Sequence, residues 1–194
     1  MVGKGTIGGL LLAAVAAGGG LSACAPATGG ASSRSAAANP ITSGPQIGRC
    51  DRSGCSWFEI QSFEMVRETE HGALLRIKLR DGESDSGSGP HPTSSRGVKI
   101  EWTGEVSDQY VFCSTKLPAI ITGGEGSYEA QRLDLIQWGN PSEYNMKVYS
   151  HVCHNGEDIL AQGKAARAGY RSIEGQEPTI ALTRPEAIFD HLRP

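Results

Sequence analysis

The sequence lacks the signatures that identify many enzymes and nucleic-acid-binding proteins. It contains no Gly-x-Ser-x-Gly elbow, no phosphate-binding loop and no His-Glu-x-x-His motif, so none of these sites is predicted. Its 18 basic residues are outnumbered by 21 acidic ones and form no basic patch, which argues against nucleic acid as a partner. No internal repeat is visible. The chain therefore offers few indications of a reaction.

An apolar run long enough to span a membrane is also missing. Residues 7–17 are apolar apart from two glycines, and Lys4 is the only charge before them. Three consecutive glycines follow at residues 18–20 and are poor helix formers, whereas a spanning helix needs roughly 20 strongly apolar residues. One positive charge followed by a short apolar segment is typical of a cleaved signal peptide.

This segment ends in Leu21-Ser22-Ala23-Cys24, which resembles the lipobox of bacterial lipoproteins. The resemblance implies that residues 1–23 are a signal peptide and that Cys24 is the lipidation site, with acyl chains such as palmitate. It also implies that the protein lies in the cell envelope, with the membrane as a partner through the anchor. Ala25 rather than Asp follows the cysteine, which in a Gram-negative host is similar to lipoproteins sent to the outer membrane. Secretory cleavage near Ala23 and a retained membrane helix are the alternatives.

The residues after Cys24 have the composition of a linker. Residues 25–48 are mostly Ala, Ser, Gly, Pro and Thr, and Arg34 is their only charge. They lack the apolar periodicity that would bury one face, so we predict a flexible tether over residues 24–48. Such a linker holds its cargo on the order of 25 to 30 Å from the lipid. The remaining residues, 49–194, suit a single globular domain.

Four cysteines lie in this domain, and their even number in an exported chain predicts two disulfides. Four cysteines permit three pairings. Cys50 and Cys55 flank a turn that contains glycine, while Cys113 and Cys153 fall in candidate buried elements. We therefore predict the pairs Cys50–Cys55 and Cys113–Cys153. A zinc site and free thiols are the alternatives.

The first half of the domain has the residue patterns of β-strands. Residues 57–67 are rich in aromatic and β-branched side chains, and residues 73–80 alternate between apolar and basic ones. These patterns predict a hairpin with its turn at residues 68–72. Gly, Ser, Asp and Pro dominate residues 81–97, for which we predict a mobile loop.

Further strand patterns follow this loop. Residues 98–103 alternate between apolar and polar side chains, and the apolar run at residues 110–113 favours a central strand covered on both faces. A short strand is expected at residues 119–121, before a glycine-rich turn. For residues 128–138 the alternation is imperfect, and we predict a strand there rather than a helix.

The second half of the domain favours helices. Asn140 as N-cap, followed by Pro141, predicts a helix that carries Cys153 on its buried stripe. A second helix is predicted at about residues 157–168, then a short strand at residues 179–182. Residues 183–186 form a capping box for a terminal helix. We therefore predict an α+β fold, with a small antiparallel β-sheet packed by C-terminal helices and stabilised by disulfides.

Reactive side chains cluster only at His151, Cys153 and His154. On a helix, residues 151 and 154 are neighbours while residue 153 turns away, so the three cannot face one point. A cysteine nucleophile also requires reduced Cys153, which export disfavours. We predict a disulfide at the helix end with surface histidines. An envelope hydrolase or metal-dependent enzyme that uses these three residues is the alternative.

Two considerations lead to a predicted function. A permanent anchor and a flexible tether present a compact domain to partners near the membrane and demand no catalytic group. Arg76, Lys78 and Arg80 form a basic row that is typical of a solvated strand face, although it would also suit an anionic surface. We predict a binding or interaction module that is not an enzyme and needs no cofactor or metal, with an envelope protein or glycan as partner. A passive structural lipoprotein is the third possibility.

Overall fold

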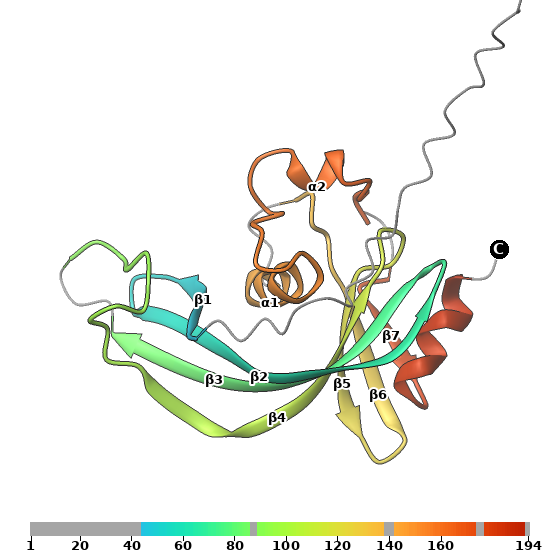
Figure 1. Ribbon diagram of the computed structural model, residues 1–194, viewed down its shortest axis with the longest axis horizontal. Coiled ribbons are helices and arrows are strands. Elements are labelled where there is room, and N and C mark those ends of the chain that lie inside the picture. The colour runs from blue at the N-terminus through green and yellow to red at the C-terminus, as the bar shows by residue number, and fades with distance from the viewer. Residues whose placement is uncertain (1–43, 86–88, 138–141, 174–176, 193–194) are drawn as a thin grey trace, which may run out of the picture. The chain divides into compact units, whose positions relative to one another are not determined.

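A computed structural model describes residues 44–85, 89–137, 142–173 and 177–192, which belong to one compact unit (Figure 1). The lipobox at residues 21–24 and the predicted tether up to residue 43 lie outside the described residues. In the part of the chain that is described, no helix combines the length and apolar character needed to cross a membrane.

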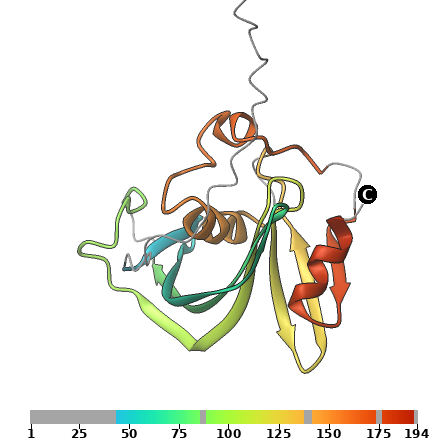
Figure 2. The ribbon, with the colours of Figure 1, turned by 45° about the vertical axis from the view of Figure 1, so that its right-hand side comes forward.

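Seven strands form one antiparallel sheet in which each strand pairs with its neighbours in the sequence. The strands are β1 (Gln46–Cys50), β2 (Gly54–Thr69), β3 (Gly72–Asp85), β4 (Glu101–Cys113), β5 (Ala119–Gly124), β6 (Ser127–Arg132) and β7 (Thr179–Leu182). The sheet curves around helix α1 (Glu143–Cys153), which lies on its concave side (Figures 1 and 2). The predicted antiparallel sheet is confirmed.

The helical part of the α+β prediction needs correction, because the fold is mainly β. Helix α2 (Lys164–Arg167) has four residues, so most of the helix predicted at residues 157–168 is wrong. Gly163, just before α2, has a φ of 70°, a left-handed conformation in which a right-handed helix cannot continue. The terminal segment η1 (Pro185–Leu192) is a 3₁₀ helix. The predicted cap Asn140 lies outside the described residues, and α1 begins at Glu143.

Two apolar clusters lie on opposite faces of the sheet. On the concave face, Leu75, Ile77 and Leu79 of β3 belong to a buried cluster with side chains of α1, as their alternation predicts. Leu74 points to the other face, where it joins a second cluster that η1 covers with Ile188. The sheet is therefore covered on both faces where the second cluster lies. This agrees with the prediction of a central strand at residues 110–113.

The predicted hairpin of β2 and β3 is confirmed, but the loop expected at residues 81–97 begins later. Strand β3 continues to Asp85, and Ser84 is 7% exposed. The reason is a partner on β2, because the Trp57 indole Nε1 donates a hydrogen bond of 2.8 Å to Ser84 Oγ. Trp57 itself is fully buried. Pairing with β2 thus holds polar residues in β3, although their composition alone predicts a loop.

The strand predicted at residues 128–138 ends at Arg132 because an acidic side chain organises the following turn. Asp134 is 4% exposed. Its Oδ1 accepts hydrogen bonds from the backbone N–H groups of Ile136 and Gln137, at 3.0 and 3.1 Å. A carboxylate that binds backbone N–H groups two and three residues later is typical of a turn. Trp138 lies outside the described residues.

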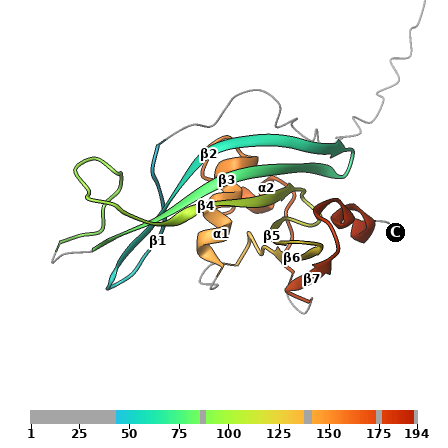
Figure 3. The same ribbon diagram turned by 90° about the horizontal axis from the view of Figure 1, so that it is seen from below.

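The long strand β2 has a free edge. Strand β1 pairs with β2 only from Cys55 to Phe58, so residues 59–69 have no partner strand on that side within the described ranges. Figure 3 shows β2 along one border of the sheet. The β2–β3 register shifts at Gln61 and at Val66, which are β-bulges on β2. The bulges divide the free edge, and its longest stretch in regular register is residues 62–65.

Strand β1 can lie close to α1 because residue 48 is a glycine. A Cβ built at Gly48 would lie 2.6 Å from Tyr144 Cε2, far inside contact distance. The Tyr144 hydroxyl also donates a short hydrogen bond to Asp81, which restricts the ring. We expect Gly48→Ala to lower the free energy of unfolding by about 1 to 3 kcal/mol, because the helix must move or the ring must turn. Chemical denaturation measures this. Gly44→Ala, where a new Cβ meets nothing within 4 Å, is the matched control.

Candidate functional site

The four domain cysteines form the two predicted disulfides. Cys50–Cys55 joins β1 to β2 across a hairpin, with a Cα–Cα distance of 4.0 Å. Cys113–Cys153 joins β4 to the end of α1, with a Cα–Cα distance of 5.4 Å. Both predicted pairings are confirmed. The second disulfide makes the Cys153 thiolate unavailable as a nucleophile or metal ligand.

The cluster of His151, Cys153 and His154 does not form one site. The His151 ring packs edge-on against Phe58 of β2, at 5.8 Å between ring centroids. His154 Nε2 lies 2.8 Å from the hydroxyl of Tyr170. The prediction that both are surface histidines is wrong, because His151 is only 9% exposed. Sequence spacing predicts that Cys153 turns away from the two histidines, but it does not show which residues each side chain contacts.

His151 lines a cavity of about 500 Å³ that opens beside α1. We call this the β1–α1 cavity. Its lining comes from β1 and the residue before it, from β2, from the segment between β3 and β4, and from α1 and the turn after it. The lining residues are Pro45, Gln46, Ile47, Trp57, Phe58, Thr93, Ser94, Ser95, Lys147, Ser150, His151, Gly156 and Asp158. Its volume lies within the range of about 300 to 1,000 Å³ that is usual for small-molecule sites.

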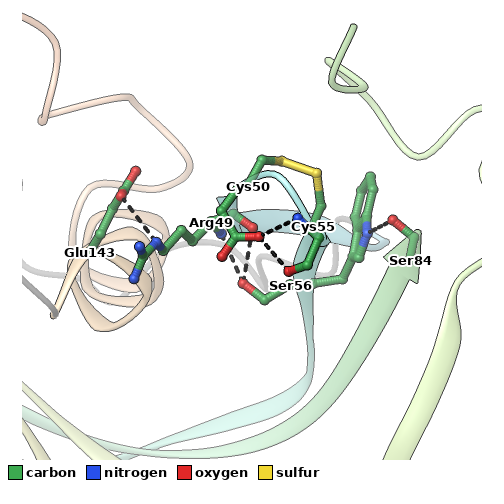
Figure 4. Close-up of a disulfide and its surroundings, with 9 residues drawn as sticks. Arg49, Cys50, Cys55, Ser56, Ser84 and Glu143 are labelled. Carbon is green, nitrogen blue, oxygen red and sulfur yellow. Dashed lines mark hydrogen bonds and ion pairs between the residues drawn. A yellow bond between two sulfur atoms is a disulfide. The ribbon is translucent and has the colours of Figure 1, made fainter. Parts of the chain in front are cut away.

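Polar contacts around the Cys50–Cys55 disulfide hold β1 in place beside this cavity (Figure 4). Ser56 Oγ accepts a hydrogen bond from the backbone N–H of Arg49 at 3.0 Å and lies 3.2 Å from its carbonyl oxygen. The Arg49 side chain reaches Glu143 at the start of α1, with 4.0 Å between Nε and Oε2. Strand β1 is thus tied to β2 by covalent and hydrogen bonds and to α1 by an ion pair. The cavity wall is fixed before any ligand binds.

The charges in the cavity lining balance one another. Lys147 Nζ lies 3.9 Å from Asp158 Oδ1, so the two formal charges of opposite sign are paired. Burial lowers the pKa of His151 below its ordinary value of 6.5, so its imidazole is neutral at pH 7. Ser150 Oγ donates to the Glu157 carbonyl at 3.1 Å, which orients the turn after the helix. The lining is therefore polar but carries no net charge.

The lowered pKa of His151 makes stability depend on pH. Between its folded and unfolded pKa values the unfolded chain binds more protons, so we expect the free energy of unfolding to fall as pH drops below about 6.5. The slope from this one group is at most about 1.4 kcal/mol per pH unit. Denaturant titrations at several pH values measure it. His151→Gln should flatten this part of the profile.

Each side chain of the predicted basic row is paired with a carboxylate from a neighbouring strand. Arg76 Nη2 lies 3.0 Å from Asp108 Oδ2, and Lys78 Nζ lies 3.5 Å from the other oxygen of the same carboxylate. Arg80 Nη2 lies 2.9 Å from Glu59 Oε2. These pairs match the expected solvated strand face. They reduce the attraction that the row would have for an anionic surface.

Three potential metal ligands lie close together beside the Cys50–Cys55 disulfide. Within the described residues, the group of three potential ligand side chains that come within 4.8 Å of one another is Cys50, Cys55 and His91. The two sulfur atoms are bonded to each other, and metals are bound by thiolates rather than by disulfides. This group therefore does not provide a ligand set in the oxidised protein.

Comparison of the chain with models of protein families, with curated proteins and with solved structures finds no match.

Sequence reasoning missed most of the β1–α1 cavity. Gln46 and Ile47 were assigned to the tether, but β1 begins at Gln46 and overlaps that prediction by three residues. Thr93 and Ser94 were assigned to a loop without a role. The sequence feature that points to the cavity is the pair of histidines near the end of α1, of which His151 lines it.

Proposed function

We propose that the chain is a lipid-anchored protein of the bacterial cell envelope, and that its globular domain is a non-catalytic module that binds an envelope component. The observation that carries this proposal is the β1–α1 cavity, which has the size of a ligand site and walls held by a disulfide and ion pairs. A fixed site lowers the conformational cost of binding. The Cys113–Cys153 disulfide weighs against the alternative of a cysteine-dependent hydrolase.

The anchor is tested at Cys24. We expect the wild-type protein to partition into the detergent phase, because several acyl chains on one cysteine hold a protein at a membrane nearly permanently. Cys24→Ser should remove the lipid and move the protein to the aqueous phase. Mass spectrometry of the N-terminal peptide identifies the modification. Lipid found on the N-terminus of the Cys24→Ser protein would contradict this assignment.

Binding is tested by blocking the cavity from its rim. The exposed Ser94 lines the cavity, so Ser94→Trp fills part of it without disturbing the core. Ser62→Trp, at an exposed position on β2 outside the lining, is the matched control. NMR spectra are recorded with saccharide and lipid fractions of the envelope. We expect one fraction to shift the amide signals of α1 and β1 in the wild type and in Ser62→Trp, but not in Ser94→Trp.

The same experiment separates a binding module from a passive structural lipoprotein. If no envelope fraction shifts these signals, or if Ser94→Trp responds as the wild type does, the proposed binding at this cavity is wrong.

A further inference from the structure

The Cys50–Cys55 disulfide has a histidine ring beside it. A ring nitrogen of His91 and the two sulfur atoms all lie within 4.8 Å of one another. The two cysteines are paired directly opposite each other in β1 and β2, so their side chains leave the sheet on the same side. His91 is exposed and comes from the segment between β3 and β4. Three elements of the fold thus bring two sulfur atoms and one ring nitrogen together.

All three groups can be reached by an ion. Cys55 is 3% exposed, yet it lines a cavity of about 760 Å³ together with Pro90 and Pro92, the two neighbours of His91 in the sequence. Cys50 is half-buried. Within the described ranges, no hydrogen bond or ion pair engages the His91 ring, so its nitrogen atoms can bind an ion.

The charge of this cavity favours a cation. Four carboxylates and two basic side chains line it, namely Asp51, Glu83, Asp85, Glu101, Arg49 and Lys99. An excess of negative charge in a cleft raises the local concentration of cations. The ligand atoms then decide between cations, because thiolate sulfur and imidazole nitrogen suit Zn²⁺, whereas Ca²⁺ and Mg²⁺ are bound by oxygen.

We propose that Cys50, Cys55 and His91 bind Zn²⁺ when the disulfide is reduced, with water as the fourth ligand. A dithiol donates two electrons and two protons to the disulfide and becomes a disulfide itself, which leaves two cysteine thiols. Zn²⁺ then displaces the two thiol protons and binds both thiolates and one imidazole nitrogen. Ligand atoms in a tetrahedral zinc site lie about 3.5 to 3.8 Å apart, so side-chain rotation suffices to form it.

The ion takes over the structural role of the disulfide. It joins β1 to β2 as the disulfide does, and it adds a link to the segment between β3 and β4. Residues 93–95 of that segment line the β1–α1 cavity, as do Gln46 and Ile47 of β1. Reduction therefore exchanges one link for another, and the walls of the β1–α1 cavity stay in place. The proposed binding function does not depend on this exchange.

The test uses Co²⁺ as a spectroscopic substitute for Zn²⁺. The full-length protein is reduced with a phosphine, which supplies no thiol ligand, and is titrated with Co²⁺ and then with Zn²⁺. We expect the visible absorption of tetrahedral Co²⁺ with thiolate ligands to appear and then to vanish as Zn²⁺ displaces Co²⁺. The oxidised protein should not show this absorption, because disulfide sulfur atoms are not thiolates.

Two histidine variants locate the site. His91→Ala should weaken Zn²⁺ binding, measured against a chromophoric chelator, by at least about tenfold, because even the loss of an outer partner of a ligand costs about 10 to 100-fold. His191→Ala, at an exposed position outside the group, is the matched control and should not change the affinity. Both variants keep all four domain cysteines, so the thiols from the Cys113–Cys153 pair contribute equally to each.

A third variant removes a thiolate. Cys50→Ser should abolish the Co²⁺ absorption while the Cys113 and Cys153 thiols remain. Absorption that persists in Cys50→Ser would place the metal at the other cysteine pair and overturn the inference. The same holds if the reduced wild type shows no absorption, or if His91→Ala binds Zn²⁺ as tightly as His191→Ala does.

Discussion

Replacing Cys113 and Cys153 together by alanine is expected to lower the free energy of unfolding by about 3 to 4 kcal/mol. The two residues are 40 positions apart, and in the chain-entropy model the loss of such a long loop constraint has about this effect. The disulfide also joins β4 to the end of α1, so its loss frees the helix that covers the concave face. Because small proteins have a total stability of only about 5 to 15 kcal/mol, this is a large fraction.

The other disulfide provides the control. Cys50 and Cys55 are five positions apart, so their double alanine variant is expected to lose only about 2 kcal/mol in the same model. Denaturant unfolding of both variants measures the difference. Equal losses would show that loop length does not determine the stabilisation. A free Cys153 thiol in peptide maps of the non-reduced wild type would contradict the pairing itself.

Asp134→Ala is expected to lower the free energy of unfolding by about 3 kcal/mol, because one carboxylate satisfies four hydrogen-bond donors from two segments. Besides Ile136 and Gln137, Ser172 Oγ donates to Asp134 Oδ2 at 2.7 Å, and the backbone N–H of Ile173 donates to it at 3.1 Å. Removing the carboxylate leaves partly buried N–H groups without this acceptor, and each such group costs roughly 1 to 3 kcal/mol. Ser172→Ala removes a single donor and should cost about 1 kcal/mol.

The wild type and Asp134→Ala should differ in free energy of unfolding by an amount that depends on pH, because the charge of Asp134 causes the difference. Burial opposes ionisation, but the hydrogen bonds from Ser172, Ile173, Ile136 and Gln137 outweigh it and hold the pKa below the ordinary value of 3.8. The stabilisation is therefore complete above about pH 3.8 and is lost as the pH falls through the lowered pKa. Stability curves of the wild type and Asp134→Ala should converge in that range. A constant difference down to pH 2 would contradict this explanation.

Alternation predicts the strand faces well because the side-chain period of a strand is fixed by backbone geometry. Leu75, Ile77 and Leu79 lie on one buried face as expected, and the hairpin before them has its turn at the predicted place. Predictions that depended on composition were less accurate. Polar residues 81–85 belong to β3 because their partners lie on β2, and the sequence does not show those partners.

Helix lengths were overestimated for a related reason. Residues 157–168 have acceptable helix propensity, yet their conformation is determined by hydrogen bonds to other parts of the chain. One example is the backbone N–H of Ile159, which donates to Ser150 Oγ at 3.3 Å. The β1–α1 cavity could not be predicted, since β1, residues 93–95 and α1 are distant in the sequence and carry no motif in common.

The two bulges on β2 limit edge-to-edge contact between neighbouring molecules if the chain is lipid-anchored, as we propose. Anchored molecules move in two dimensions and meet one another far more often than free ones, so a straight free edge would recruit the edge of a neighbour into an extended sheet. On the free edge of β2, residues 59–69, the longest run in regular register is residues 62–65, which is shorter than the usual strand of about 5 to 6 residues. The free edge of β2 thus offers only a short template to the edge of a neighbouring molecule, which opposes the growth of an extended sheet.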